Sequence, residues 1–337
     1  MRTRILVTGG AGFIGHHFVE HLLKKTDWEI IIVDSLSYAS NGMDRLHDIR
    51  AFDARRVKLL TFDLAHKPAW GVQKEIGQVD YIIHIAAETH VDNSIAEPEV
   101  FVQANVFGTF HMLQFARTQG NLKKFVYFST DEVFGPAPEG TSFKEWDRYN
   151  SSNPYSATKA GGEELCLAWG NTYQVPILIT HTMNAFGERQ HPEKFIPLVL
   201  RKVLADEVVQ IHSNPGKTSS GSRSYIHCRN IAAAVLFLLE KGKNQDKYNV
   251  VGEKEISNLE LAQFIARVVG RRLNYQLVDY HSSRPGHDLR YALDGEKMKE
   301  MGWTVPAFFE ASLEKTVRWM LEPENIKWLF LSKETYA

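Results

Sequence analysis

The first half of the chain alternates short, continuous runs of apolar residues with longer segments that have helical spacing. The apolar runs lie at residues 5–7, 30–33, 57–62, 81–85, 125–128 and 177–180. Because these runs do not alternate polar and apolar residues, we expect strands that are buried on both faces. Such strands, separated by helices, are typical of a parallel sheet covered on both sides. The expected fold class is therefore α/β, with a doubly wound parallel sheet.

The second half is less regular and predicts a smaller α/β domain. Helical spacing is found at 195–204, 231–241, 259–269 and 313–321, and the Gly/Ser/Pro-rich segment 213–222 predicts a loop. We expect domains at 1–182 and 183–337, with a return of the chain to the sheet near 223–252, around residues 225–231. Three apolar residues in a row, Trp328 to Phe330, predict that the final stretch docks on the body or on a partner chain.

Charge and cysteine content exclude several classes of protein. The 337 residues carry 39 Lys and Arg against 40 Asp and Glu, a formal charge of −1, which argues against nucleic acid as a partner. No apolar run reaches the roughly 18 residues that span a bilayer, so we expect no membrane partner. Cys166 and Cys228 lie in no Cys/His cluster, so we expect neither a metal site nor a disulfide framework, and a cytoplasmic location.

Three glycines stand between the first expected strand and the first expected helix, residues 13–25. Gly9, Gly12 and Gly15 in this position allow a tight turn, a close approach of a pyrophosphate and close helix–strand packing. Asp34 ends the second strand, where a carboxylate accepts hydrogen bonds from ribose hydroxyls and repels a 2′-phosphate. The pattern predicts NAD rather than NADP; the alternative is an ordinary turn with Asp34 as a helix cap. Asp63, after the third strand, stands where an adenine would lie, or is a turn residue.

A tyrosine and a lysine four residues apart suggest a base. On a helix, Tyr155 and Lys159 share one face, and an ammonium near a phenol favours the phenolate, which can accept a proton near neutral pH. The alternative is an exposed helix face.

Two adjacent carboxylates, Asp131 and Glu132, follow the fifth strand at the edge where α/β sheets bind ligands. Such a pair can divide into one acid and one base. Because adjacent strand residues point to opposite faces, both reach a substrate only if the strand has already ended. The alternative is a solvated acidic turn.

Together these motifs resemble the extended short-chain dehydrogenase/reductase family, and within it the dTDP-glucose 4,6-dehydratases, over residues 4–321. The glycine and tyrosine motifs are shared by the whole superfamily, whereas Thr130-Asp131-Glu132 and Arg284-Pro285-Gly286-His287-Asp288 are more specific. The other matching segments are 86–92 and 192–197. The resemblance implies an NAD-binding Rossmann domain. It also implies a homodimer that pairs helices near 100–117 and 155–171 in a four-helix bundle.

By this resemblance the chain is a hydro-lyase that converts a nucleotide-linked hexose, first of all dTDP-glucose, to the 4-keto-6-deoxy sugar. The reaction oxidises C4, removes water across C5–C6 and returns hydride to C6. The implied catalytic residues are Thr130, Asp131, Glu132, Tyr155 and Lys159. The implied cofactor contacts are Tyr155 and Lys159 together with Gly9, Gly12, Phe13, Ile14, Gly15, Asp34, Ser35, Ser37, Asp63, Leu64, Ala86, Ala87 and Thr89. The implied substrate contacts are Thr89, Thr130, Asn184, Lys194, Phe195, Gln210, His212, Arg223, Asn249, Arg284, His287 and Asp288.

Departures from the family pattern leave alternatives open. Asn184 is followed by Ala185 where the family has a second asparagine, and the segment after Arg223 lacks the family's Asp-Trp, so UDP, CDP and GDP remain open beside dTDP. A 4-epimerase or a decarboxylase of the same family is the enzyme alternative, although epimerases lack the Asp-Glu pair and decarboxylases carry Ser-Glu. A non-catalytic NAD-binding sensor is the alternative from another class, but a sensor needs no such set of acids and bases.

Overall fold

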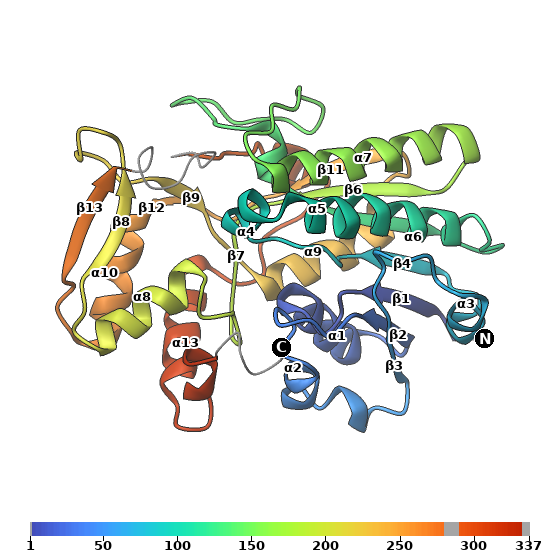
Figure 1. Ribbon diagram of the computed structural model, residues 1–337, viewed down its shortest axis with the longest axis horizontal. Helices are drawn as coiled ribbons and strands as arrows, with labels where there is room; N and C mark the ends of the chain where they lie inside the picture. Colours follow the sequence, from blue (N-terminus) through green and yellow to red (C-terminus); the bar gives the residue numbers. More distant parts are fainter. Residues whose placement is uncertain (1, 280–289, 332–337) are drawn as a thin grey trace.

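The computed structural model describes residues 2–279 and 290–331, and its centre is one seven-stranded sheet (Figure 1). All neighbouring strands in it are parallel, in the order β11-β6-β5-β4-β1-β2-β3. The strands are β1 (Arg4–Thr8), β2 (Glu29–Asp34), β3 (Val57–Thr61), β4 (Tyr81–His84), β5 (Lys124–Thr130), β6 (Ile177–Thr182) and β11 (Asp246–Val250). The predicted doubly wound parallel sheet is confirmed. The strand order reverses between β1 and β4, where such sheets bind ligands.

Helices cover both faces of the sheet, which explains why its strands are apolar throughout. They are α1 (Phe13–Lys25), α3 (Trp70–Ile76), α5 (Pro98–Phe101), η2 (Val102–Phe107), α6 (Gly108–Ala116), α7 (Pro154–Tyr173) and α9 (Cys228–Lys241). On one face, α1 and α9 pack against side chains such as Val7, Ile32 and Val126. On the other face, α3, α6 and α7 pack against side chains such as Leu6 and Phe125. The long helix expected near 100–117 is α5, η2 and α6 in direct succession, with π-helical turns at η2.

A smaller α/β unit with its own core lies at one end of the molecule (Figure 1). Its main elements are α8 (Phe195–Leu204), β8 (Val209–Ser213), α10 (Asn258–Val269), β13 (Tyr275–Asp279) and α13 (Phe309–Leu321). Strands β8 and β13 pair in parallel. Two short pairs also form: β7 (Ala185–Phe186) with β10 (Ile226–His227), and β9 (Ser222–Ser224) with β12 (Glu255–Ser257). Of the segment 213–222 that was expected as a loop, residues 214–221 connect β8 to β9, while Ser213 ends β8 and Ser222 begins β9.

The chain joins the central sheet again through β11, which pairs with β6. We expected this return within residues 223–252, around 225–231. Strand β11 lies inside the wider range, whereas residues 225–231 form β10 and the first turn of α9, so the chain reaches the sheet only after that helix. Near the C-terminus, η4 (Ile326–Leu329) docks on the body, with Trp328 and Leu329 fully buried. In residues 2–279 and 290–331 no helix is long and apolar enough to cross a membrane.

Candidate active site

The glycine turn joins β1 to α1 with little room for side chains. Gly9 has φ +70°, a conformation that favours glycine. A Cβ on Gly15 would clash with the carbonyl oxygen of Gly9, and one on Gly10 would lie 2.7 Å from Ile32 Cγ2. Within the described residues no side chain caps the start of α1 at Gly12. The free N–H groups of that first turn are therefore available to an anionic ligand.

Asp34 stands at the end of β2 and is held by the backbone. Its carboxylate accepts hydrogen bonds from Ala11 N at 2.9 Å and Leu36 N at 2.8 Å. The side chain is almost completely buried, and burial raises its pKa, although these backbone donors and Arg45 act in the opposite direction. The glycine turn and the acidic residue are thus fixed to each other directly.

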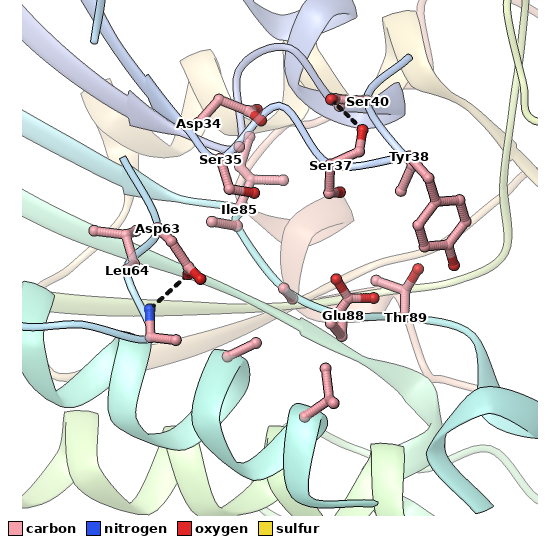
Figure 2. Close-up of a pocket in the computed structure, with 18 of the residues that line it drawn as sticks. Asp34, Ser35, Ser37, Tyr38, Ser40, Asp63, Leu64, Ile85, Glu88 and Thr89 are labelled. Atoms are coloured by element: carbon pink, nitrogen blue, oxygen red, sulfur yellow. Dashed lines mark hydrogen bonds between the residues drawn. The ribbon is translucent and has the colours of Figure 1, made fainter. Parts of the chain in front are cut away.

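These residues open onto a cavity of about 990 Å³. Figure 2 shows Asp34, Ser35 and Ser37 on one side of it, with Glu88 and Thr89 opposite. The predicted cofactor residues that line it are Gly9, Gly12, Phe13, Ile14, Gly15, Asp34, Ser35, Ser37, Asp63, Leu64, Ala86, Ala87 and Thr89. Only Tyr155 and Lys159, of that predicted set, are not among the lining residues.

The carboxylate pair lies just beyond the end of β5. The strand stops at Thr130, and Asp131 and Glu132 begin the short 3₁₀ helix η3 (Asp131–Phe134). Thr130 Oγ1 accepts a hydrogen bond from Glu132 N at 3.3 Å and donates one to Asp131 Oδ1 at 2.9 Å. Because the strand ends before Asp131, both carboxylates can reach the same ligand.

Burial raises the pKa values of both carboxyl groups toward neutral pH. It raises the pKa of Asp131 to about 6, against the lowering effect of Arg223 and Thr130. It raises the pKa of Glu132 to about 7, and the neighbouring charge of Asp131 adds to the increase. Two groups that hold and release protons near pH 6 to 7 are suited to acid–base chemistry at neutral pH.

Helix α7 brings the tyrosine–lysine pair to the same place. Asn153 caps the helix through a capping box with Ser156 and also donates from Nδ2 to Glu132 Oε2 at 3.3 Å. The cap therefore joins the start of α7 to the carboxylate pair. One helical turn separates Tyr155 from Lys159, and both are buried.

The electrostatics of Tyr155 differ from the prediction that the lysine favours a phenolate. Burial raises the pKa of Tyr155, the charges of Glu132 and Asp131 raise it further, and a hydrogen bond with Thr130 lowers it. The Lys159 ammonium instead lies 4.3 Å from the centre of the Tyr127 ring. Burial and the neighbouring carboxylates thus favour the protonated phenol in this structure.

Comparisons with known proteins fit this arrangement. A family model described as the NAD dependent epimerase/dehydratase family matches residues 5–251. A probable dTDP-glucose 4,6-dehydratase of Sinorhizobium fredii is 37% identical over 333 residues, 95% of this chain and 93% of the relative. The chain belongs to the NAD dependent epimerase/dehydratase family. The resemblance noted from the motifs is confirmed.

Solved structures of this family share the fold over almost the whole chain. DesIV, a dTDP-glucose 4,6-dehydratase from Streptomyces venezuelae solved with NAD, matches with a TM-score of 0.86 at 35% identity, covering 96% of this chain and 98% of that one. A UDP-glucose 4-epimerase of Thermus thermophilus, also solved with NAD, matches with a TM-score of 0.84 at 26% identity, covering 95% and 100%. Because a dehydratase and an epimerase match almost equally well in fold, the side chains must decide between the two reactions.

The glycine turn of this family member fits a dinucleotide. The uncapped start of α1 faces the cavity with free N–H donors, and Asp34 keeps a carboxylate at its rim. Of the predicted substrate residues, Thr89 and Lys194 line the same cavity. At the neighbouring strand ends, Asp131 Oδ2, Thr182 Oγ1 and Asn184 Oδ1 are buried and have no hydrogen-bond partner among the described residues. Unpaired polar atoms of this kind are costly unless a ligand or water pairs with them.

Four other predicted substrate residues, which the structure describes, are not among the residues that line the cavity. Phe195 opens α8, Gln210 and His212 lie in β8, and Arg223 lies in β9, where its guanidinium stands 4.6 Å from the centre of the Tyr291 ring. The Arg223 charge nevertheless acts on Asp131 and Glu132, so this arginine stands near the carboxylates. Arg284, His287 and Asp288 lie outside the described residues.

The prediction for Asn249 requires correction. This side chain is 1% exposed inside β11. Its amide donates to Phe143 O at 3.0 Å and Asp294 O at 2.9 Å, and its oxygen bonds His181 Nδ1 at 3.0 Å. With the amide occupied in this way, Asn249 holds the fold together and does not face a ligand.

Several polar residues of the site were not predicted from the sequence. Tyr38, Glu88 and Glu193 line the cavity (Figure 2 for the first two), and burial raises the pKa of Glu88. Glu193 stands inside the matching segment 192–197, which was a usable signal. Behind the carboxylates, Glu163 forms the centre of a buried polar cluster, and no local pattern pointed to it.

Proposed function

We propose that the protein is an NAD-dependent nucleotide-sugar 4,6-dehydratase that forms the 4-keto-6-deoxy sugar. The observation that carries this proposal is the carboxylate pair at the end of β5. Asp131 and Glu132 are adjacent, both have raised pKa values, and Asn153 links them to the helix of Tyr155 and Lys159. An epimerase, which only removes and returns hydride at one carbon, needs no second acid–base pair.

The residues then have separate roles. Bound NAD would supply the acceptor for the hydride of C4 and, once reduced, the hydride for C6. Tyr155 takes the proton from the 4-hydroxyl, while Thr130 hydrogen-bonds the 4-oxygen. Because burial raises the pKa of Tyr155, the Lys159 ammonium one helical turn away must stabilise the phenolate when substrate is present.

The carboxylates carry out the elimination. The 4-ketone makes the C5 proton acidic, and Glu132 removes it. Asp131 protonates the departing 6-hydroxyl, so that water leaves. Oxidation must precede elimination, because a C–H bond next to a saturated alcohol is not acidic. Each acid or base of this kind typically increases the reaction rate by about 10²–10⁴-fold.

The rest of the predicted site belongs to the same proposal. The cofactor residues that line the cavity bind NAD, and Asp34 accepts its ribose hydroxyls. Asn184, Lys194, Arg223 and the segment 284–288 meet the nucleotide sugar, since arginine and lysine suit a diphosphate. We propose dTDP as the first nucleotide and UDP as the second.

The deciding experiment supplies the protein with dTDP-, UDP-, CDP- and GDP-hexoses and follows the products by mass spectrometry. We expect loss of one water from one of these substrates, without net consumption of NAD. A product of unchanged mass but inverted C4 configuration would make the protein an epimerase. Binding of NAD without turnover of any sugar would favour a sensor.

We also propose a homodimer, a domain boundary near residue 182 and a cytoplasmic location. Two apolar side chains of η2, Val102 and Phe107, are 40% and 45% exposed next to α7, which supports pairing in a four-helix bundle. The separate core around β8, α10 and α13 supports the boundary. Cys166 and Cys228 are buried free thiols, as is usual in a reducing compartment.

A further inference from the structure

Glu163 lies at the centre of a buried cluster that joins four parts of the chain. Its side chain is fully buried on α7. The carboxylate accepts hydrogen bonds from Ser129 Oγ at the end of β5, Tyr149 OH ahead of α7, and His181 Nε2 of β6 at 3.0 Å. Lys247 Nζ of β11 stands 3.5 Å away and donates to Tyr149 OH.

This carboxylate contacts the strand end that carries the proposed catalytic groups, and it lies on the same helix as Tyr155 and Lys159. Ser129, which it holds, precedes Thr130 in β5. On α7, Glu163 follows Lys159 by four residues and Tyr155 by eight, so the three side chains lie along one face of the helix. One buried group thus fixes the strand end to the helix, and its own charge is close to the lysine.

Glu163 is ionised in this setting. Burial by itself raises the pKa of Glu163, but the charges of His181 and Lys247 and the hydrogen bonds from His181 and Ser129 outweigh it, so the pKa is lowered overall. A buried carboxylate persists only with such partners.

Lys159 depends on that charge. Burial lowers the pKa of Lys159 to about 8, and the negative charge of Glu163 is the largest effect in the opposite direction. The other groups that face the ammonium are Cys166 on α7, the Tyr127 ring on β5 and His84 on β4, whose own pKa is lowered to about 3 by burial and by Lys159. Glu163 is therefore the main partner that favours the charged lysine.

We propose that Glu163 is a positioning residue of this site: it keeps the Lys159 ammonium charged and fixes α7 against the strand end that carries Thr130, Asp131 and Glu132. This inference rests on the proposed function, in which Lys159 contacts bound NAD and stabilises the phenolate. It assigns Glu163 no contact with substrate or cofactor.

The test measures NAD affinity as a function of pH, which requires no sugar substrate. In the wild type, affinity should fall as Lys159 loses its proton near pH 8. In Glu163→Gln this alkaline decline should move to lower pH by roughly one unit, because the neighbouring negative charge favours the protonated lysine. Glu164→Gln removes the exposed carboxylate next in the helix and should keep the wild-type profile.

Two further variants separate the electrostatic role from loss of packing. Glu163→Asp keeps the charge, so its decline should stay at the wild-type pH even if affinity falls overall. Lys247→Gln removes a cation that lowers the pKa of Glu163, so it should move the decline to lower pH, as Glu163→Gln does, and provides a second test if Glu163→Gln does not fold. An unchanged profile in Glu163→Gln, a shift equal to that of Glu164→Gln, or a Lys247→Gln shift to higher pH would each overturn the proposal.

The result is independent of the dehydration assay. A shifted profile in a protein that dehydrates no hexose would support the role of Glu163 and refute the dehydratase. Dehydration of a hexose together with an unshifted profile would support the dehydratase and refute the role of Glu163. A wild-type affinity with no alkaline decline would overturn the role of Glu163, while the mass-spectrometric assay would still decide the reaction.

Discussion

The glycine turn and the carboxylate centre lie at the same edge of one sheet, yet they are built in different ways. The turn uses backbone groups from adjacent residues, and its fit depends on missing side chains at Gly9 and Gly15. The carboxylate centre uses charged side chains, and burial sets their pKa values. A site of the first kind is sensitive to added atoms, whereas a site of the second kind is sensitive to changes in charge.

The largest effect is expected from an added atom in the turn. In Gly15→Ala the new Cβ would clash with the carbonyl oxygen of Gly9, and neither backbone segment can move without opening the turn. We expect NAD affinity to fall by more than about 100-fold, or roughly 3 kcal/mol, and dehydration to disappear with it. Calorimetric titration with NAD measures the change. Gly71→Ala, in α3 with open space around the added atom, should bind as the wild type does.

The difference in construction also explains what the sequence could predict. The turn was predictable because the strand, the three glycines and the helix are contiguous, and Asp34 follows at the end of the next apolar run. The sheet was predictable for the same reason, since each strand is a local apolar run.

The polar cluster behind the carboxylates was not predictable. The partners of Glu163 are Ser129, Tyr149, His181 and Lys247. They come from four separate segments, and their positions in the sequence follow no regular pattern. The pKa of Tyr155 was predicted in the wrong direction because spacing places the lysine on the same helix face but says nothing about burial. Asn249 was misassigned because its burial in β11 depends on the return of the chain to the sheet.

The next largest effects should come from changes to the acid–base groups without added atoms. Tyr155→Phe should lower kcat by about 10²–10⁴-fold by blocking oxidation at C4, with NAD affinity nearly unchanged. Glu132→Gln should lower it by a similar factor but at a later step, so that C4 is still oxidised and solvent deuterium does not enter C5. Single-turnover absorbance of the reduced cofactor and mass spectrometry in D₂O distinguish the two. If Glu132→Gln and Asp131→Asn both dehydrate at wild-type rates, the carboxylate pair is structural.

A smaller effect is expected in the pH profile. Activity needs Glu132 ionised and Asp131 protonated, and burial raises these pKa values to about 7 and about 6. The singly protonated pair is therefore most populated between these values, and kcat/KM should peak there. Because Glu132 has the higher pKa, the proton of this pair lies mainly on Glu132, and the active form with the proton on Asp131 is the minor one. It should fall at lower pH as both groups are protonated and at higher pH as both are ionised.

Arg223 provides a way to move that profile. Its positive charge lowers the pKa of both carboxyl groups, so Arg223→Gln should shift both limbs to higher pH by up to about one unit. Arg318→Gln, on the exposed side of α13, is the matched control and should leave the limbs in place. Limbs that stay in place in Arg223→Gln would show that this arginine does not act on the pair.

The smallest expected effect concerns the C-terminal segment. It tests whether the glycine turn and the cavity loop at Ala39 depend on contacts with this distant part of the chain. Trp328 is fully buried, donates from its indole N–H to Asp48 Oδ2 at 3.0 Å, and lies with its ring centre 5.3 Å from the Arg45 guanidinium. Arg45 in turn donates to Ala39 O at 2.8 Å, in the loop that lines the cavity. Within the described residues, Trp328 therefore connects the C-terminal segment to the cofactor loop through Arg45 and α2 (Asp44–Asp48).

Trp328→Phe keeps a ring beside Arg45 but removes the donor to a carboxylate. We expect the free energy of unfolding in urea to fall by roughly 1.5–3 kcal/mol, since hydrogen bonds to charged groups contribute about that much. NAD affinity should fall a few-fold at most, because Arg45 still holds Ala39. Trp70→Phe, with its side chain 73% exposed on α3, should change neither quantity. A loss of NAD affinity as large as that of Gly15→Ala would mean that the cofactor site is not built locally, because a segment nearly 300 residues away would then be as necessary to it as the glycine turn itself.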